Sequence, residues 1–361
     1  MNKKDLHLRD FAIVLAWPDA TIRGDEKWMM FFRKLGIVKN LNFKVGHTGV
    51  VIVSHKTGEL LYYDFGRYIA PRGYGRARSK FSDPQLVINT KAVISGNKIE
   101  NLLEIAEALE EVKPYMYGDG ILYFSVIPNI DFELAKHYGA ACVAQGTYPY
   151  GAVAKNNNNC SRFIARMLMK STSRFHYFHG LNLPETIKAS PTSNLVNGVE
   201  DRMIYSYTPK QGVKNFKMNR WGSFFFLVKQ LGDNVFTKRA KELPEDLSIG
   251  KMKFRQRPHN LGDDAIYLGG VGDGAWYTSE HVGDGIYKIS RYNVRGELEY
   301  KVLGKPDKGF NPNVPFTITY DSHLLFTTFQ QLEVKIKVTH TEVLYCDNPA
   351  VRKKKVSIKY A

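Results

Sequence analysis

Hydrophobic residues in the first half of the chain follow strand and helix periods in turn. The run Phe11–Pro18 predicts a buried strand that proline ends, and Phe43–Val53, rich in β-branched residues, predicts a second strand. Ser54–Gly58 then predicts a hairpin turn, after which Glu59–Tyr68 returns as the partner strand. The remaining predictions for this half are helices over 25–35, 98–112 and 132–144 and strands over 91–95 and 120–128.

Residues after Lys251 show a different pattern, in which short apolar segments alternate with turn residues. Segments of this kind begin at Ala265, Ala275, Gly285, Leu298, Phe316, Leu324 and Leu332. Their spacing of about 8–12 residues is typical of a small β-sandwich or barrel. Two Gly-Asp-Gly copies, at 272–274 and 283–285, predict hairpin turns, because the further acidic ligands of a calcium loop are missing.

These patterns predict an α+β protein with an antiparallel sheet packed on helices in its first half and a β-rich second half. The predicted parts are a first domain over 1–185, a connecting region over 186–250, a β-rich accessory domain over 251–345 and a basic tail over 346–361. The connecting region begins in sequence rich in Asn, Pro, Ser and Thr. It also contains the run Phe224–Val228, which is apolar enough to be buried.

Composition fits a globular protein, since 43% of the 361 residues are hydrophobic and 13% are aromatic. No run approaches the roughly 20 apolar residues of a membrane span, so no span is predicted. The first ten residues lack the apolar segment of a signal peptide. Together these features predict a cytoplasmic protein.

The net charge of +16 is compatible with a polyanionic partner such as nucleic acid or anionic lipid. The basic residues are spread along the chain, with short clusters only at 67–80 and 352–355, which argues against specific nucleic-acid binding. The first cluster is interpreted as a solvated loop carrying Arg67, Arg72, Arg76 and Arg78, and the alternative is an anion-binding flap. An anionic ligand therefore stays open as a partner.

Chemical interest centres on Cys160, which directly follows the asparagine run 156–159. Asparagine favours turns and helix caps, and Phe163, Ile164, Met167 and Leu168 then recur at helical spacing. A helix is therefore predicted to begin at or beside Cys160, with Asn159 as its N-cap. Unpaired backbone N–H groups and the helix dipole at that position favour the thiolate, which is how a nucleophilic cysteine is usually prepared.

The three cysteines, Cys142, Cys160 and Cys346, are widely spaced and form neither a disulfide framework nor a zinc motif. Reduced thiols are the simplest prediction, and neither a metal nor another cofactor is implied. Cys142 lies among alanine and valine and is predicted to be buried. Burial without chemistry is also the alternative for Cys160.

A base for Cys160 is offered by His47, which lies between Gly46 and Gly49 at a strand start. If the hairpin turn lies at 55–58, Gly49 faces Asp64, and His47 and Asp64 share one face as diagonal neighbours. Asp64 then holds the imidazole, and Tyr62 on the same face is the reserve candidate. A register slip of one residue would place Asp64 on the opposite face.

The order of these motifs resembles that of the circularly permuted papain-like hydrolases, which include permuted NlpC/P60 proteins and lecithin–retinol acyltransferase-like enzymes. The resemblance covers roughly residues 10–175 and rests on Gly46-His47-Thr48-Gly49-Val50-Val51-Ile52, on Tyr148-Pro149-Tyr150 and on Asn159-Cys160-Ser161. It implies a permuted papain-like first domain in which histidine precedes cysteine. The whole chain also resembles an uncharacterised Bacteroidetes family built on a domain of unknown function.

The resemblance implies roles for particular residues. Cys160 would be the nucleophile, His47 the general base, and a polar residue on the following strand the group that orients the base. Family members often place that third residue where this chain has Glu59, at the hairpin end, a position that the register does not favour. Oxyanion or substrate contacts would come from the Cys160 backbone N–H and from nearby groups. The candidates for these nearby groups are Tyr148, Tyr150, Asn159 and Tyr62. The alternative role of Tyr148 and Tyr150 is packing against the cysteine helix.

The function that follows is a cysteine hydrolase or acyltransferase. A Cys160 thiolate with a His47 base would act on the amide, ester or thioester of a small-molecule or peptide substrate. The alternative is a non-catalytic binding protein on a papain-like scaffold that recognises a polyanionic partner.

Overall fold

The computed structural model describes residues 9–23, 31–32, 34–36, 42–44, 46–151, 157–172, 190–235, 256–270 and 273–347. Two compact units make up the chain. The first contains Met1–Gly66, Ile88–Gln145 and Pro149–Asp246, and the second contains Arg67–Val87, Gly146–Tyr148 and Leu247–Ala361. Each unit therefore draws on separate stretches of sequence. The predicted division at residues 185, 250 and 345 stays a prediction.

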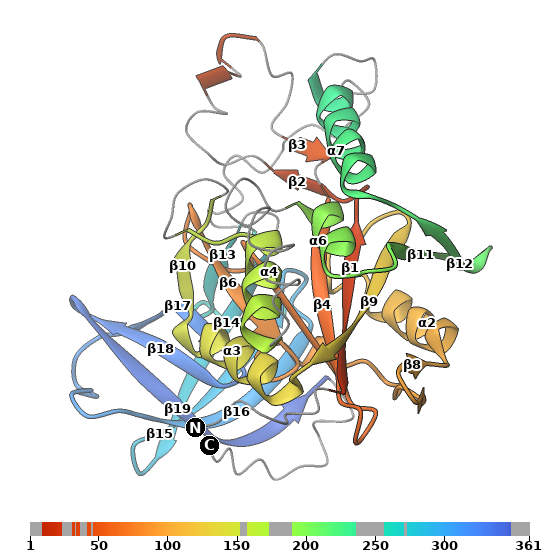
Figure 1. The fold of residues 1–361 in the computed structure, drawn as a ribbon. Coiled ribbons are helices and arrows are strands. Elements are labelled where there is room, and N and C mark those ends of the chain that lie inside the picture. Colours follow the sequence, from red (N-terminus) through yellow and green to blue (C-terminus); the bar gives the residue numbers. More distant parts are fainter. Residues whose placement is uncertain are drawn as a thin grey trace. The chain divides into compact units, whose positions relative to one another are not determined.

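A sheet of antiparallel strands forms the centre of the first unit (Figure 1). Its strands in this unit lie in the order β5-β4-β1-β9-β11-β12. The bounds are β1 (Asp10–Trp17), β4 (His47–Val53), β5 (Leu60–Gly66), β9 (Leu122–Ile130), β11 (Met203–Thr208) and β12 (Gly212–Lys217). The two central strands β1 and β4 are buried along almost their whole length, which explains why their sequences read as continuous apolar runs.

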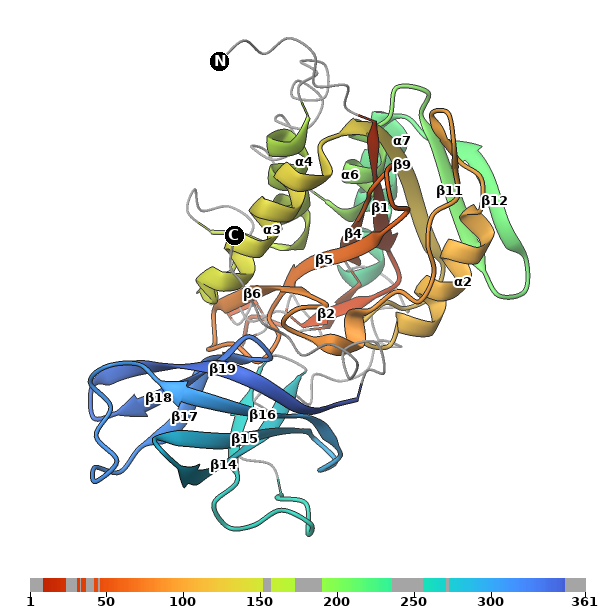
Figure 2. The ribbon, with the colours of Figure 1, turned by 90° about the horizontal axis from the view of Figure 1, so that it is seen from below.

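Helices α3 (Phe132–Gln145), α4 (Cys160–Ser171) and α6 (Pro191–Asn197) cover one face of this sheet, and α2 (Leu102–Val112) lies on the other side (Figure 2). Gly139 of α3 lies against the ring of Tyr63, where a Cβ atom would come within 2.5 Å of the ring. A glycine is therefore required for α3 to approach the sheet this closely. The helices and strands predicted for 98–112, 120–128 and 132–144 are all confirmed, with shifted ends.

The remaining elements of the first half are short. They are β2 (Thr21–Arg23), β3 (Asn42–Lys44), β6 (Tyr74–Ser79), a 3-10 turn (Pro84–Leu86), β7 (Ile94–Ser95), β8 (Lys98–Ile99) and β10 (Thr147–Pro149). Most of the helix predicted over 25–35 and the basic tail from 348 onward lie outside the described residues.

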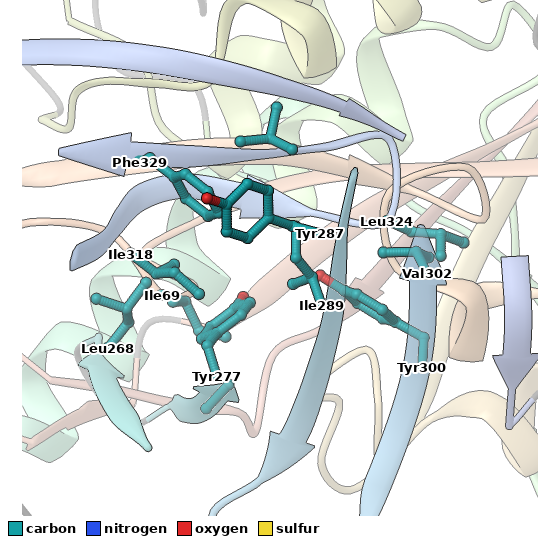
Figure 3. Close-up of a cluster of buried hydrophobic side chains, with 12 residues drawn as sticks. Ile69, Leu268, Tyr277, Tyr287, Ile289, Tyr300, Val302, Ile318, Leu324 and Phe329 are labelled. Carbon is teal, nitrogen blue, oxygen red and sulfur yellow. The ribbon is translucent and has the colours of Figure 1, made fainter. Parts of the chain in front are cut away.

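The second unit contains a seven-stranded antiparallel sheet in the order β13-β14-β15-β16-β19-β18-β17. The bounds are β13 (Ile266–Gly269), β14 (Gly274–Gly283), β15 (Ile286–Asn293), β16 (Leu298–Pro306), β17 (Thr317–His323), β18 (Phe326–Gln331) and β19 (Val334–Cys346). Each strand that the sequence predicted in this half is present. Tyr287, Ile289 and Phe329 belong to its buried apolar cluster (Figure 3).

The second Gly-Asp-Gly copy forms the tight turn between β14 and β15, as predicted, with Asp284 and Gly285 both at positive φ. The first copy begins outside the described residues, and its Asp273 and Gly274 lie where β14 starts.

The prediction that 67–80 is a solvated loop is wrong, because strand β6 runs through it and buries two arginines. Arg76 donates hydrogen bonds of 2.8 and 2.7 Å to the two carboxylate oxygens of Asp83. The guanidinium carbon of Arg78 lies 3.3 Å from the ring centroid of Tyr68. The Asp83 carboxylate and the Tyr68 ring compensate the charges of the two arginines, which lowers the free-energy cost of burying them.

The stretch 186–250, which the sequence predicts to be a connecting region, contains α6, β11, β12 and helix α7 (Arg220–Val235), and β11 pairs with β9 of the central sheet. The run Phe224–Val228 lies in α7, but Phe224, Phe225 and Val228 are exposed, so the prediction that this run is buried is wrong.

The chain is therefore a mixed α/β protein with antiparallel sheets and a β-rich C-terminal region. Among the residues that the structure describes, no helix combines the length and apolar character needed to cross a bilayer.

Candidate functional site

The start of α4 places Cys160 at the first residue of the helix, as the sequence predicts. Asn159 is the N-cap in extended conformation, and its Oδ1 accepts a hydrogen bond of 2.8 Å from the backbone N–H of Arg162. Asn159 N–H in turn donates to Oδ1 of Asn158 at 3.1 Å. The first-turn amides at Cys160 and Ser161 have no intrahelical acceptor by helix geometry, so N–H dipoles surround the thiol.

The segment before the helix is fixed by backbone pairing between Tyr150 and Asn158. Asn158 N–H donates to the Pro149 carbonyl at 3.1 Å, and Gly151 N–H donates to the Asn158 carbonyl at 2.9 Å. The Tyr150 ring stacks on Phe65 with centroids 5.9 Å apart. The Tyr150 ring therefore packs on β5, and its predicted role at an oxyanion or substrate stays a prediction. Tyr148 is half-buried in β10 and belongs to the second unit, so its predicted role stays a prediction.

The hairpin of β4 and β5 has the predicted register, with Gly49 opposite Asp64. His47 and Asp64 consequently share one face, and His47 Nε2 lies 3.4 Å from Asp64 Oδ2. The same oxygen accepts a hydrogen bond of 3.0 Å from the Tyr62 hydroxyl. Tyr62, the reserve candidate, is thus a partner of Asp64.

Two glycines make this arrangement possible. Gly49 leaves space for the Tyr62 ring, since a Cβ there would lie 2.5 Å from that ring. Gly46 has a φ of +80°, and a Cβ there would lie 2.9 Å from Pro18 Cα. Both positions exclude other residues for steric reasons, and Gly46 also for its backbone conformation.

The imidazole of His47 is buried, and burial by itself lowers its pKa. Hydrogen bonds to Asp64 and to the Cys160 thiol, together with the charges of both groups, outweigh burial and raise the pKa of His47 to about 9. With a pKa of about 9, His47 is mainly in its imidazolium form at neutral pH.

Trp17 also belongs to this cluster, although no sequence motif indicates it, because its ring is stacked on His47 with centroids 6.1 Å apart and planes at 10°. Trp17 and His47 are directly opposite each other in the β1–β4 pairing. An indole face beside an imidazolium favours the charged form. An aromatic residue at the end of the strand that pairs with β4 would have been the sequence signal. No local pattern, however, shows which strand pairs with β4.

Asn194, in the predicted connecting region, is a second residue near the site that no sequence motif indicates. Asn194 lies on α6, is fully buried and donates a hydrogen bond of 2.8 Å from Nδ2 to the Ser161 carbonyl. Its Oδ1 is buried and has no hydrogen-bond partner in the described part of the chain. Asn194 therefore anchors the first turn of α4 from a segment that lies later in the sequence.

Other candidates are placed away from this cluster. Glu59 lies at the hairpin turn, where its carbonyl accepts from Ser54 N–H at 3.0 Å, and Asp64 is the carboxylate that lies beside His47 Nε2. Cys142 is buried in α3, as predicted, and Cys346 is buried at the end of β19. Within the described ranges, no group of three or more His, Cys, Asp and Glu side chains is arranged to hold a metal ion.

Comparison with known families gives two matches, one in each half of the chain. Residues 12–177 match the model of a family described as "Type VI secretion system effector TseH-like", a stretch that contains Trp17, His47, Tyr62, Asp64 and Cys160. Residues 265–341 match the model described as "DUF6695 C-terminal domain". The predicted membership in a Bacteroidetes family stays a prediction.

Among solved structures, the crystal structure of the type VI secretion system effector TseH aligns with 58% of this chain and 100% of that chain. The two sequences are 19% identical over the alignment, and the TM-score is 0.39. No protein in the curated collection matches.

Proposed function

We propose that the first unit is a cysteine hydrolase or acyltransferase in which Cys160 is the nucleophile and His47 the acid–base residue. The observation that carries the proposal is the cluster of Cys160, His47 and Asp64, in which the imidazole bridges a helix-start thiol and a buried carboxylate. Tyr62 and Trp17 support it, since one holds the carboxylate and the other covers the imidazole.

The chemistry follows from the protonation of this cluster. The thiolate of Cys160 attacks the carbonyl carbon of an amide, ester or thioester, and the backbone N–H of Cys160 stabilises the oxyanion. Imidazolium at His47 gives its proton to the leaving group as the bond to nitrogen, oxygen or sulfur breaks. Neutral His47 then takes a proton from water, whose oxygen attacks the acyl-enzyme and releases the acid and the thiolate. With another nucleophile in place of water, the same site is an acyltransferase.

The fold that we propose for residues 10–175 is the circularly permuted papain-like arrangement. It is supported by the order of the elements, because the histidine strand β4 precedes the cysteine helix α4 in the chain. The description of the matched family as an effector supports a further part of the proposal, that the hydrolase acts as a secretion-system effector. The predicted cytoplasmic location remains the competing proposal.

The test is site-resolved alkylation by iodoacetamide as a function of pH, in the wild type and in His47→Ala. Cys142 and Cys346 serve as internal controls, because both are buried and neither lies in the cluster. We expect Cys160 to be labelled well below pH 8, near which an ordinary thiol ionises, and His47→Ala to remove that advantage. If Cys160 is inert, or reacts alike without His47, the hydrolase proposal fails and a non-catalytic binding protein is the better description.

A second measurement identifies the bond. The protein is incubated with an activated ester, a thioester and a peptide, and intact-mass spectrometry searches for an acyl adduct on Cys160. An adduct that forms in the wild type and is absent in Cys160→Ala supports acyl transfer. Asp64→Asn should accumulate less adduct, because His47 loses the carboxylate that keeps it protonated.

A further inference from the structure

Helix α7 contacts the protein through polar side chains as well as through apolar ones such as Phe226, whose ring packs on Tyr123. Its buried residues include Ser223 and Gln230, and Gln230 Nε2 donates a hydrogen bond of 2.6 Å to the Pro18 carbonyl. Ser223 Oγ donates to Thr192 Oγ1 of α6 at 3.1 Å. The helix is therefore held to the protein partly by polar side chains, whereas a surface helix usually buries its apolar face.

The outward face carries an aromatic stripe, defined here as Trp221, Phe224, Phe225 and Val228. These positions follow the i, i+3, i+4, i+7 spacing, so they form one continuous line on the helix. Trp221 is 70% exposed and Phe225 is 64% exposed. The three rings contact one another, with centroids 5.9 to 6.5 Å apart. A contiguous exposed cluster of this kind marks an interaction surface.

The sequence around the stripe is rich in basic residues, and the acidic Glu200, Asp201 and Asp233 lie just outside this basic stretch. Between 202 and 232 there are six Lys or Arg residues and no Asp or Glu. All six are exposed: Arg202, Lys210, Lys214, Lys217, Arg220 and Lys229. Arg220 lies one turn before Phe224, and Lys229 one turn after Phe225, so cations flank the stripe at both ends.

Arginines also gather at the N-terminal end of α7. Arg202 and Arg220 line a cavity of about 420 Å³, together with Trp221, Asn197 and one acidic residue, Glu200. The Met218 N–H donates to the Arg202 carbonyl at 3.1 Å, which holds the base of the β11–β12 hairpin beside the start of the helix. Positive charge is therefore concentrated next to the most exposed aromatic residue of the stripe.

We infer that the aromatic stripe of α7 docks on an anionic membrane surface. Trp221, Phe224 and Phe225 insert into the headgroup boundary, while Arg220 and Lys229 contact lipid phosphates. A single narrow stripe suits shallow insertion better than a protein interface, which needs roughly 800 Å² from each partner. The excess of cations over the acidic Glu200, Asp201 and Asp233 complements an anionic leaflet better than a neutral one.

The experiment is flotation of the full chain with vesicles of phosphatidylcholine alone and of phosphatidylcholine mixed with phosphatidylglycerol. We expect binding to the mixed vesicles only, and weaker binding as salt rises. Trp221→Ser with Phe225→Ser should weaken binding at least about tenfold, because the inserted apolar area is lost. The matched control is Leu332→Ser with Val334→Ser, which changes two equally exposed apolar residues of the second unit and should leave binding unchanged.

Charge is tested separately by Arg220→Glu with Lys229→Glu, which should also weaken binding about tenfold or more. Its control is Lys308→Glu with Lys335→Glu, two exposed lysines elsewhere. Alkylation of Cys160 in each variant verifies that the fold is intact, so failure of docking is distinguishable from failure of the hydrolase proposal. Absence of vesicle binding overturns the inference, as does binding that the α7 variants leave unchanged. Concentration-dependent self-association through the stripe without vesicle binding overturns it too, because a second copy then covers the face.

Discussion

Tyr62 and Asp64 lie two residues apart on β5, and the tyrosine hydroxyl donates a hydrogen bond of 3.0 Å to the carboxylate oxygen that also faces His47. The tyrosine therefore fixes the orientation of the carboxylate, which in turn fixes the imidazole. A side chain that holds the carboxylate in this way also influences the position of the imidazole.

Tyr62→Phe should slow alkylation of Cys160 at neutral pH about tenfold without unfolding the protein, since a net hydrogen bond to a charged group contributes about 1.5–3 kcal/mol. The control is Tyr63→Phe on the opposite face of β5, whose hydroxyl donates to the Lys136 carbonyl at 3.4 Å. Equal rates in the two variants would remove Tyr62 from the positioning role.

Asp64→Asn should lower the pKa of His47 from about 9 to below its ordinary 6.5, because burial then acts with less opposition. The measurement is the titration of the His47 ring protons by NMR in the two proteins. We expect acyl transfer to fall at least about a hundredfold at neutral pH. A His47 pKa that stays near 9 in the variant would show that Asp64 is not its main partner.

The pH dependence of stability has opposite signs in different parts of the protein. The raised pKa of His47 contributes stability below pH 6.5 that is lost as pH rises towards 9, by up to about 3 kcal/mol. Burial lowers the pKa of His323 to about 3 and of His340 to about 4, so their contribution is present above pH 6.5 and is lost on acidification. Denaturant titrations of wild type, His47→Gln and His340→Gln between pH 4 and 9 test this. His47→Gln should reduce only the loss of stability as pH rises towards 9, and His340→Gln only the loss on acidification.

Gly49→Ala should disrupt the site from a distance, because the added Cβ would lie 2.5 Å from the Tyr62 ring and push it away from Asp64. Overpacking of this kind typically costs about 1–3 kcal/mol of unfolding free energy. The control is Gly232→Ala in α7, where no atom lies within 4 Å of the added carbon and helix propensity favours alanine. Gly49→Ala should lower both the midpoint temperature of thermal unfolding and the rate of Cys160 alkylation. Gly232→Ala should lower neither.

Asp83→Asn should cost about 3–5 kcal/mol in the second unit, because it leaves two buried cations, Arg76 and Arg291, with less compensating charge. The arginine partners hold the pKa of Asp83 far below its usual range, despite burial. Asp263→Asn is the contrast, since its ion pair with Arg257 lies at the surface and should contribute less than about 1 kcal/mol. Equal losses of unfolding free energy in the two variants, measured by denaturant titration, would show that the buried ion pair contributes no more to stability than the exposed one.

Local sequence signals were sufficient for the centre of the site. The asparagine run located the start of α4, and the hairpin turn fixed the β4–β5 register, which brought His47 and Asp64 to one face. Trp17 and Asn194 were missed because they reach the site through pairings between strands and helices distant in sequence. No short-range pattern encodes such pairings.

The errors have a common physical cause. Arg76 and Arg78 were predicted to be solvated because their charge is visible in the sequence, whereas the carboxylate and ring that neutralise them are not recognisable as partners. The run Phe224–Val228 was predicted to be buried because hydrophobicity does not say which face of a helix meets the protein. Both errors concern the environment of a side chain, and in both places the element itself, β6 and α7, was not predicted.

The stretch 67–87 belongs to the second unit although the chain reaches it from β5 of the first. Its Asp83 lies 3.5 Å from Arg291, and its Gln85 donates to Glu299 at 3.1 Å. The segment 265–341, which a family model recognises by itself, therefore lacks part of the second unit's interior when it is produced without residues 67–87. Any shuffling of this C-terminal segment between proteins, in evolution or in the laboratory, must carry an insertion from the first half with it.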